Sequence, residues 1–270
     1  MIEKEIKTLK AFSSEVENRI NNSTDKLLWF RGCGNSNYKL SPTIHRHPII
    51  KDPKSIIELE QKIVNRFKQR SIPFLNRNLN LENKWEVLFY MQHYGTPTRL
   101  LDWSENPYIA LYFAVTSSSY KRVDKKIEYL NDVSIWFLDP VKWNRKILED
   151  VGYSEGIISY ESKHIDSFEP FTDFNLMREK PIAIYGTHNS GRIVAQRGVF
   201  TIFGKGIKPM EVIFDEDKFS GDTLIKIVIP KEKIQDILDS LISIGITDSV
   251  VFPDLDGLSK EVKRFYKFDI

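Results

Sequence analysis

The sequence is poor in cysteine and in long apolar runs. Its 270 residues include a single cysteine, Cys33, so no intrachain disulfide can form and a disulfide-stapled secreted fold is excluded. No run of about 18 apolar residues occurs, which leaves no candidate for a helix that spans a bilayer. The N-terminal residues intersperse charges among apolar side chains and lack the apolar core of a signal peptide. We therefore expect a cytoplasmic protein without a membrane partner.

An excess of charge of either sign is also absent. The 39 Lys and Arg residues oppose 37 Asp and Glu residues, which leaves a net charge of +2. This near-neutral balance gives no global steering towards nucleic acid or an anionic membrane, although a local basic face stays open. No low-complexity tract, internal repeat or Gly/Ser linker divides the chain. We expect one domain over residues 1–270, with a helical segment at 1–26, a core at 27–258 and a tail at 259–270.

Several nucleotide and metal motifs are missing. There is no Gly-rich dinucleotide fingerprint and no phosphate-binding GxxxxGK[ST] motif, which disfavours kinases, P-loop ATPases and Rossmann dehydrogenases. His45 and His47 lack the cysteines or second histidine pair of a zinc site. Asp254 and Asp256 have no third ligand in register, so a turn and helix start is a better interpretation than a cation site. We expect no metal.

The spacing of apolar residues predicts helices early in the chain and strands late. Helical spacing and helix-start signals such as Asn106-Pro107 predict helices at residues 2–20, 52–70, 85–94, 108–116, 141–148, 231–244 and 259–265. Short segments rich in β-branched or aromatic residues predict strands at 27–31, 98–101, 133–138, 181–185, 192–196, 199–203, 212–214 and 224–229. This order favours an α+β fold over a regularly alternating parallel sheet.

Arg31 is the first candidate for a functional side chain. It ends the apolar run Leu27–Arg31, and Gly32 and Gly34 follow it. A buried guanidinium needs a partner. The partner is either an internal carboxylate or a ligand phosphate or carboxylate that the guanidinium holds in a bidentate manner. The two glycines leave room for a ligand to approach the backbone, which tips the balance slightly towards the ligand.

The densest group of different polar side chains lies between His93 and Asn106. A helix is predicted on each side, so this segment is held at both ends, as is common in binding sites. A structural interpretation covers part of it: Asp102 pairs with Arg99, Asn106 caps the next helix and Trp103 packs in the core. It explains poorly why so many polar types surround the apolar residues of the segment.

Four motifs occur in an order that points to one family. They are FRG around Arg31, QHYGTPTRLLDWSENPYIALYFA, RIVAQRGVFTIFG and FPDLDGL. In these motifs the sequence resembles the FRG domain family from Leu27 to Leu258. It is also, more loosely, similar to ADP-ribosyltransferases, which have a strand-borne arginine, a short strand leading into a helix and a late strand with a polar residue in this order. That resemblance implies an ADP-ribosyltransferase-like split central β-sheet core with N-terminal and peripheral helices.

The second resemblance also implies roles for individual residues, with NAD as a substrate. Arg31 would hold the NAD diphosphate. Ser104, or His93 and Thr98 near it, would line the nicotinamide side. NAD binding is accordingly assigned to Arg31, Gly32, Thr98, Arg99, Trp103, Ser104, Asn106 and Arg192. Catalysis is assigned to Arg31, His93, Asp102 and Gln196.

Gln196 departs from the superfamily pattern, which usually has a glutamate at this third position. A neutral amide cannot supply the negative charge that favours an oxocarbenium-like transition state. Either another acid, Asp102 or Glu211, replaces it, or the reaction is slow, or the domain only binds a nucleotide. The amide alternatively aligns the acceptor by hydrogen bonds. A purely structural role for Gln196 and Arg192 on the outer face of an edge strand also stays open.

We expect an enzyme that cleaves NAD and transfers ADP-ribose to a macromolecular acceptor, which is RNA, DNA or protein. By family analogy, this activity suits a bacterial toxin or phage-defence effector with an antitoxin or chaperone partner. The alternative is a non-catalytic module that binds a nucleotide or a partner. A third hypothesis is nucleic-acid binding or cleavage through the basic stretch Lys62–Arg77 and Asp254 with Asp256, although solvated helix charges explain that stretch as well.

Overall fold

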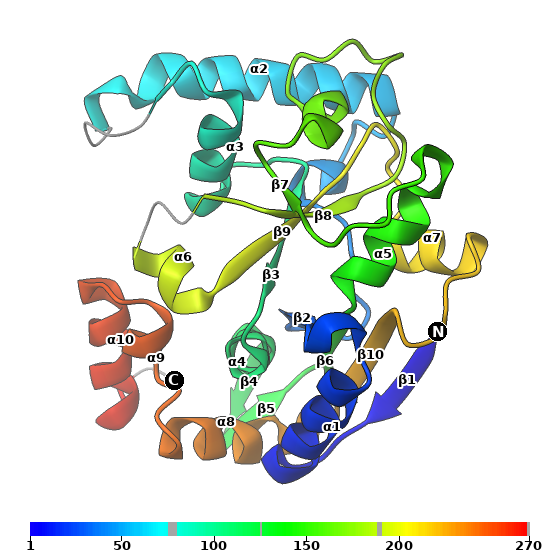
Figure 1. The fold of residues 1–270 in the computed structure, drawn as a ribbon. Coiled ribbons are helices and arrows are strands. Elements are labelled where there is room, and N and C mark those ends of the chain that lie inside the picture. The colour runs from blue at the N-terminus through cyan, green and yellow to red at the C-terminus, as the bar shows by residue number, and fades with distance from the viewer. Residues whose placement is uncertain (75–79, 125, 188–190, 269–270) are drawn as a thin grey trace.

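A computed structural model describes residues 1–74, 80–124, 126–187 and 191–268, so that Arg77 of the basic stretch lies outside the described residues. They form an α+β fold around a large mixed sheet (Figure 1). Its strands follow in the order β1-β10-β6-β2-β3-β9-β8-β7, in which the two outermost pairs are parallel and the other neighbours antiparallel.

The strands of this sheet are β1 (Ile2–Glu5), β2 (Trp29–Cys33), β3 (Leu100–Ser104), β6 (Val133–Leu138), β7 (Ile158–Ser159), β8 (Ile182–Tyr185), β9 (Gly198–Ile202) and β10 (Leu224–Ile229). A separate hairpin consists of β4 (Tyr120–Val123) and β5 (Lys126–Tyr129). The helices are α1 (Leu9–Asn21), α2 (Pro53–Ser71), α3 (Lys84–His93), α4 (Pro107–Thr116), α5 (Pro140–Ile147), α6 (Gly191–Gln196), α7 (Met210–Glu216), α8 (Ile234–Ser243), α9 (Asp248–Val251) and α10 (Leu255–Phe265). Within the described ranges, none of them combines the length and the apolar composition that crossing a membrane demands.

The sheet is nearly divided between β2 and β3. β2 pairs along its whole length with β6, and β3 does so with β9. In the described part of the chain, β2 and β3 are joined only at Phe30 and Ser104. The sheet therefore consists of two halves, β1-β10-β6-β2 and β3-β9-β8-β7, which separate beside this pair.

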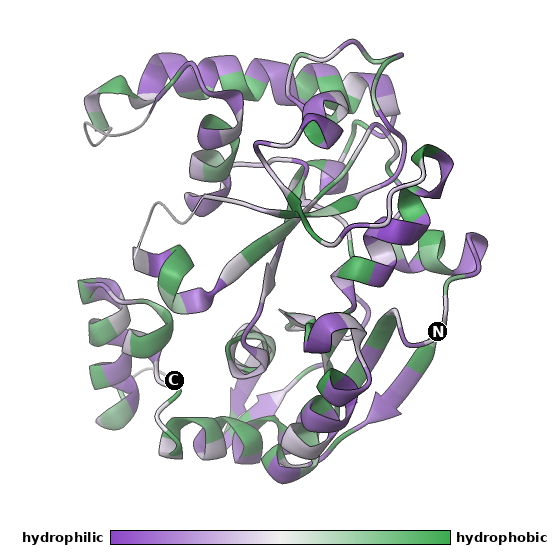
Figure 2. Cartoon of the chain, in the orientation of Figure 1, coloured by the Kyte–Doolittle hydropathy of each residue, from purple (hydrophilic) through white to green (hydrophobic). Residues whose placement is uncertain are grey.

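Helices α1, α4 and α8 pack on the first half of the sheet and form its largest hydrophobic cluster with β6 and β10. Figure 2 shows that α1 and α8 mix hydrophilic and hydrophobic residues, as expected for helices with one buried face. By contrast, α4 is apolar on all sides and almost wholly buried. A Cβ atom on Gly32 would lie 1.9 Å from the carbonyl oxygen of Ala110. Glycine is thus required here because β2 and α4 approach so closely.

Helix α3 packs on the second half of the sheet. Its Trp85, Leu88 and Phe89 share a hydrophobic cluster with strands β8 and β9. Helix α2 lies across α3 through a small core that includes Val64 and Met91. The C-terminal end of α3 is thereby fixed close to β3 and β9 (Figure 1).

Most predicted elements are present, and three are wrong. Residues 192–196 belong to helix α6 and not to a strand. In this helix Arg192 and Gln196 lie on the same side and line the cavity, and Ile193 is buried. Residues 212–214 belong to helix α7, whose buried Met210, Ile213 and Phe214 have helical spacing. Residues 2–5 do not begin the first helix but form edge strand β1, which pairs with β10.

The C-terminal segment begins its helix earlier than predicted. Helix α10 starts at Leu255 rather than at residue 259. The Asp254 carboxylate caps it by accepting a hydrogen bond of 2.7 Å from the Gly257 backbone N–H. The interpretation of the FPDLDGL motif as a helix start is confirmed.

Candidate functional site

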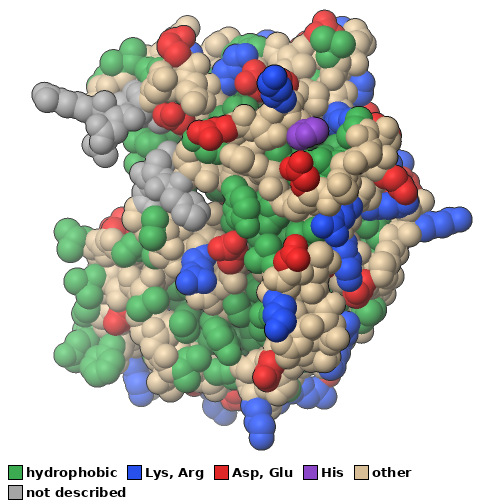
Figure 3. Space-filling model, viewed as in Figure 1, with side chains coloured by type: hydrophobic (Ala, Val, Ile, Leu, Met, Phe, Trp, Pro, Cys, Tyr) green, Lys and Arg blue, Asp and Glu red, His purple; other side chains and the backbone are tan. Residues whose placement is uncertain are grey.

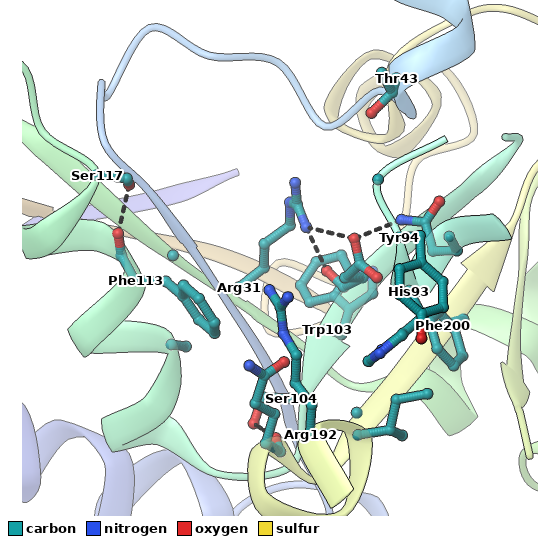
Figure 4. A pocket seen from close by; sticks show the side chains of 18 of the residues that line it. Arg31, Thr43, His93, Tyr94, Trp103, Ser104, Phe113, Ser117, Arg192 and Phe200 are labelled. Carbon is teal, nitrogen blue, oxygen red and sulfur yellow. Dashed lines mark hydrogen bonds and ion pairs between the residues drawn. The ribbon is translucent and has the colours of Figure 1, made fainter. Parts of the chain in front are cut away.

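A cavity of about 770 Å³ opens where the two halves of the sheet separate. Strand β2, strand β3 and the C-terminal end of α3 form its walls, together with α4, α6 and β9. Its polar lining includes Arg31, Thr43, Gln92, His93, Thr96, Asp102, Ser104, Ser117, Arg192, Gln196 and Asp254, and its aromatic lining includes Phe30, Tyr94, Trp103, Phe113 and Phe200. Figure 4 shows Arg31 and Arg192 extending into the same space beside His93 and Trp103.

Arg31 bridges the two halves of the sheet at the cavity. Its Nη1 donates a hydrogen bond of 2.6 Å to the backbone carbonyl of Asp102 and lies 4.0 Å from Oδ2 of the same residue. The Arg31 side chain is 22% exposed. A guanidinium carries five N–H donors, more than this contact uses. Arg31 is therefore able to hold an anionic group in the cavity as well.

A chain of hydrogen bonds orients the Asp102 carboxylate. The buried Thr98 hydroxyl donates to Gln92 Oε1 at 2.6 Å, which turns the amide nitrogen of Gln92 towards β3. Gln92 Nε2 then donates to Asp102 Oδ2 at 2.6 Å. Gln92 thus connects a buried hydroxyl to the carboxylate that faces Arg31.

Asp102 is an unusual member of a buried strand. Its neighbours Leu101 and Trp103 are buried, whereas its own side chain is 55% exposed. Desolvation by the cavity walls raises the pKa of the Asp102 carboxyl, and Arg31 and the hydrogen bond from Gln92 oppose this rise. Because water still reaches the side chain, the carboxyl is open to a ligand and to proton exchange.

His93 and Arg192 lie on another side of the cavity. Desolvation and the charge of Arg192 lower the pKa of His93, and Asp102 opposes the shift. The imidazole is therefore neutral near pH 7. The Arg192 guanidinium carbon lies 4.7 Å from the centre of the Phe252 ring, a cation–π contact that joins α6 to the segment before α10.

Gln196 and Ser104 line the cavity with side chains that are engaged in local structure. Gln196 Nε2 donates to the backbone carbonyl of Val251 at 3.1 Å, and the backbone carbonyl of Gln196 accepts a hydrogen bond of 2.7 Å from the Ser104 hydroxyl. The same hydroxyl accepts from the Asn106 backbone N–H at 2.9 Å. These contacts fix α6 and the start of α4 against β3.

Three predicted binding residues, Thr98, Arg99 and Asn106, lie outside the cavity lining. Arg99 is fully buried: it donates through Nε to Glu60 at 2.7 Å and through its two terminal nitrogens to the carbonyls of Phe203 and Phe168 at 2.7 Å each. Its guanidinium is therefore occupied by the protein itself, and the proposed pair with Asp102 does not form. The Asn106 side chain caps α4 by accepting from the Tyr108 backbone N–H at 3.0 Å.

Thr98 and Glu211 also serve the interior rather than the cavity. Thr98 acts only through Gln92, because it is fully buried. Glu211 of α7 is the other acid considered as a replacement for the glutamate. Its carboxylate accepts a hydrogen bond of 3.1 Å from the backbone N–H of Leu40. Asp102 is thus the one of the two candidate acids that lines the cavity.

Several lining residues were not singled out from the sequence, namely Gln92, Thr43, Phe113 and Phe200. Gln92 precedes His93 directly and opens the long motif quoted above, so its position was the one available signal. The aromatic residues carry no such signal, since buried aromatic side chains occur throughout the core.

Comparison with protein families identifies the part of the chain that bears this site. Residues 26–122 match the family model described as FRG domain. Neither the curated proteins nor the solved structures include a match to the chain. The matched residues contain Arg31, Gln92, His93 and Asp102, which meet in the cavity. The segment that builds the centre of the site is therefore the part of the chain that is similar to the FRG domain family.

Proposed function

We propose that the chain is an ADP-ribosyltransferase that cleaves NAD and transfers ADP-ribose to a macromolecule. The observation that carries this proposal is the meeting of Arg31, Asp102 and Gln92 in a cavity at the break between the two halves of the sheet. The break supports an ADP-ribosyltransferase-like split sheet. A volume of about 770 Å³ lies within the usual range for sites that bind small molecules and cofactors.

The two guanidinium groups supply the anion-binding part of the site. Arg31 and Arg192 point into one cavity from β2 and α6 (Figure 4). Guanidinium groups bind phosphate oxygens in a bidentate manner. The diphosphate of NAD would thus lie between them, and its negative charge would offset the repulsion between the two cations.

Asp102 supplies the negative charge that Gln196 lacks. In the proposed reaction the bond between ribose C1′ and the nicotinamide nitrogen breaks, and nicotinamide leaves with the electron pair. The positive charge that develops at C1′ is stabilised by the Asp102 carboxylate. A nucleophilic atom of the acceptor then bonds to C1′ and gives its proton to the same carboxylate.

Gln92 and the neutral His93 complete this assignment. Gln92 holds Asp102 Oδ2 in place by its hydrogen bond. A neutral imidazole beside the cavity adds no positive charge next to C1′. Aromatic residues such as Trp103, Tyr94 and Phe113 provide surfaces against which the flat rings of NAD can pack.

The test is incubation of the purified chain with NAD labelled in its adenine ring, together with cell lysate, while released nicotinamide and macromolecular label are both measured. We expect nicotinamide release that falls about 100-fold in Asp102→Asn and at least about 100-fold in Arg31→Ala. Arg66→Ala, an exposed arginine on α2, is the matched control for Arg31→Ala. Saturable NAD binding without turnover would instead support a non-catalytic nucleotide-binding module.

The biological setting proposed for this activity is that of a toxin or phage-defence effector, which rests on family analogy alone. Such an effector would need an inhibitor or chaperone partner in the cell that makes it. Expression of the chain in a sensitive host tests this setting, since growth should stop with the wild type and continue with Asp102→Asn.

A further inference from the structure

Helix α10 turns an apolar stripe to the solvent. Leu255, Leu258, Val262 and Phe265 follow at positions i, i+3, i+7 and i+10, which places them on one side of the helix. All four are exposed, and Leu255 is 82% exposed. Figure 3 shows hydrophobic side chains gathered at the lower left, where α10 lies. Contiguous exposed apolar side chains of this kind mark interaction surfaces.

Another side of α10 attaches the helix to the molecule, mostly through polar groups. Arg264 Nε donates to Asp248 Oδ2 at 2.8 Å. Glu261 accepts a hydrogen bond of 3.0 Å from the backbone N–H of Ser249. Gly257 is buried, and a Cβ atom there would lie 2.0 Å from the carbonyl oxygen of Phe252. The apolar stripe is thus not needed to hold the helix in place.

The stripe begins at the wall of the cavity. Asp254, directly before Leu255, lines the cavity. The segment before it is tied to α6 by the hydrogen bond from Gln196 to Val251 and by the contact of Arg192 with Phe252. One other exposed residue with a large ring, Tyr94, lines the cavity as well. A bound macromolecule that reaches the cavity from this side would therefore meet an apolar surface.

The charges beside the cavity distinguish between the classes of acceptor. A nucleic acid needs cations that neutralise its phosphates. Asp254 and Asp256 lie at the cavity end of α10, whereas Lys263 and Lys267 lie at its far end. A polyanion at the cavity end of α10 would thus meet two carboxylates, whereas a protein surface would cover the apolar stripe.

We propose that the acceptor of ADP-ribose is a protein, which docks apolar side chains on Leu255, Leu258, Val262 and Phe265 while the residue to be modified enters the cavity. This inference rests on the proposed transferase activity and names its acceptor class. The heteroatom of that residue bonds to ribose C1′ as nicotinamide leaves with the electron pair, and its proton passes to Asp102.

The experiment compares the ratio of protein-bound label to released nicotinamide in the wild type, in Leu255→Glu/Leu258→Glu and in Leu176→Glu. Leu176 is an exposed leucine outside α10 and the cavity lining, so its variant should keep the wild-type ratio. The stripe variant should lower the ratio at least roughly tenfold, as expected when central contacts of an interface are lost. Glutamate in the first turn of α10 is compatible with the helix.

Treatment of the products separates the remaining outcomes. Release of the label by protease and not by nuclease supports the inference. Release by nuclease, with a loss of label in Lys263→Glu/Lys267→Glu and none in the stripe variant, would overturn it in favour of a nucleic-acid acceptor. Nicotinamide release without any macromolecular label would overturn it while leaving NAD cleavage intact. If no nicotinamide is released, the proposed transferase activity itself is wrong and the acceptor inference falls with it.

Discussion

Arg31 and Arg99 both lie in the segment that matches the FRG domain model, yet their surroundings differ sharply. Arg99 is wholly inside the protein, where Glu60 and two backbone carbonyls occupy its guanidinium. Arg31 is partly exposed in a cavity and contacts the carbonyl of Asp102. The guanidinium of Arg99 has protein partners for its hydrogen-bond donors, whereas the guanidinium of Arg31 has donors left to bind a ligand. This difference in occupied donors, rather than burial alone, separates a structural arginine from a candidate binding residue.

The largest effect should follow from removal of the structural arginine. Arg99→Ala leaves the buried Glu60 carboxylate without its partner, which should lower the free energy of unfolding by about 3–5 kcal/mol. Chemical denaturation monitored by tryptophan fluorescence measures this loss. A change in the free energy of unfolding below about 1 kcal/mol would mean that Arg99 does not stabilise the fold.

Arg31→Ala should have the reverse pattern. The rate of nicotinamide release should fall at least about 100-fold, whereas the free energy of unfolding should fall by only about 1 kcal/mol, since one hydrogen bond to a carbonyl is lost. Arg31→Lys keeps the charge without the planar fork and should restore part of the activity. An equal loss of stability in Arg31→Ala and Arg99→Ala would erase the distinction between the two arginines.

Asp102→Asn isolates the negative charge at the centre of the cavity. The amide keeps the shape of the side chain, so folding and NAD binding should persist while turnover falls about 100-fold. Binding measured by calorimetry and turnover measured by nicotinamide release separate the two properties. Glu211→Gln, on a candidate acid outside the cavity lining, is the control. Turnover that falls in Glu211→Gln and not in Asp102→Asn would transfer the catalytic role to Glu211.

Gln92→Ala should have the smallest effect on activity, and this effect should appear in the pH dependence of nicotinamide release. The hydrogen bond from Gln92 lowers the pKa of the Asp102 carboxyl, so its removal should raise that pKa further. Because the reaction needs the ionised carboxylate, activity should then be lost at a higher pH as the pH falls. The acidic limb of the profile of nicotinamide release against pH measures the shift. An unchanged limb in Gln92→Ala would show that Gln92 does not tune Asp102.

Much of the fold was predictable because local patterns and packing agree. The apolar run at β6, the Asn106-Pro107 start of α4 and the amphipathic spacing of α2 all specify the observed elements. The strand predictions at 192–196 and 212–214 were wrong because short runs of β-branched residues are ambiguous between strand and helix. Strand β1 was missed for another reason: it forms by pairing with β10, which is far away in the sequence.

The site was predictable in outline and not in its contacts. Arg31, His93, Asp102 and Gln196 do meet in one cavity, although they come from separate parts of the chain. The sequence could not show that Arg99 prefers Glu60 to Asp102, because this pair joins α2 to the start of β3. Nor could it show that Gln92 carries a hydrogen bond from Thr98 to Asp102. Both facts depend on tertiary packing.

We propose that Arg31 belongs to a binding site for the NAD diphosphate and not to the framework of the fold. The most direct measurement is the rate of nicotinamide release from NAD by the wild type and by Arg31→Ala, with the unfolding midpoint recorded on the same samples. We expect turnover by the wild type, its loss in the variant and midpoints that differ by a few degrees at most. Equal rates, or a variant whose unfolding transition has collapsed, would contradict this proposal.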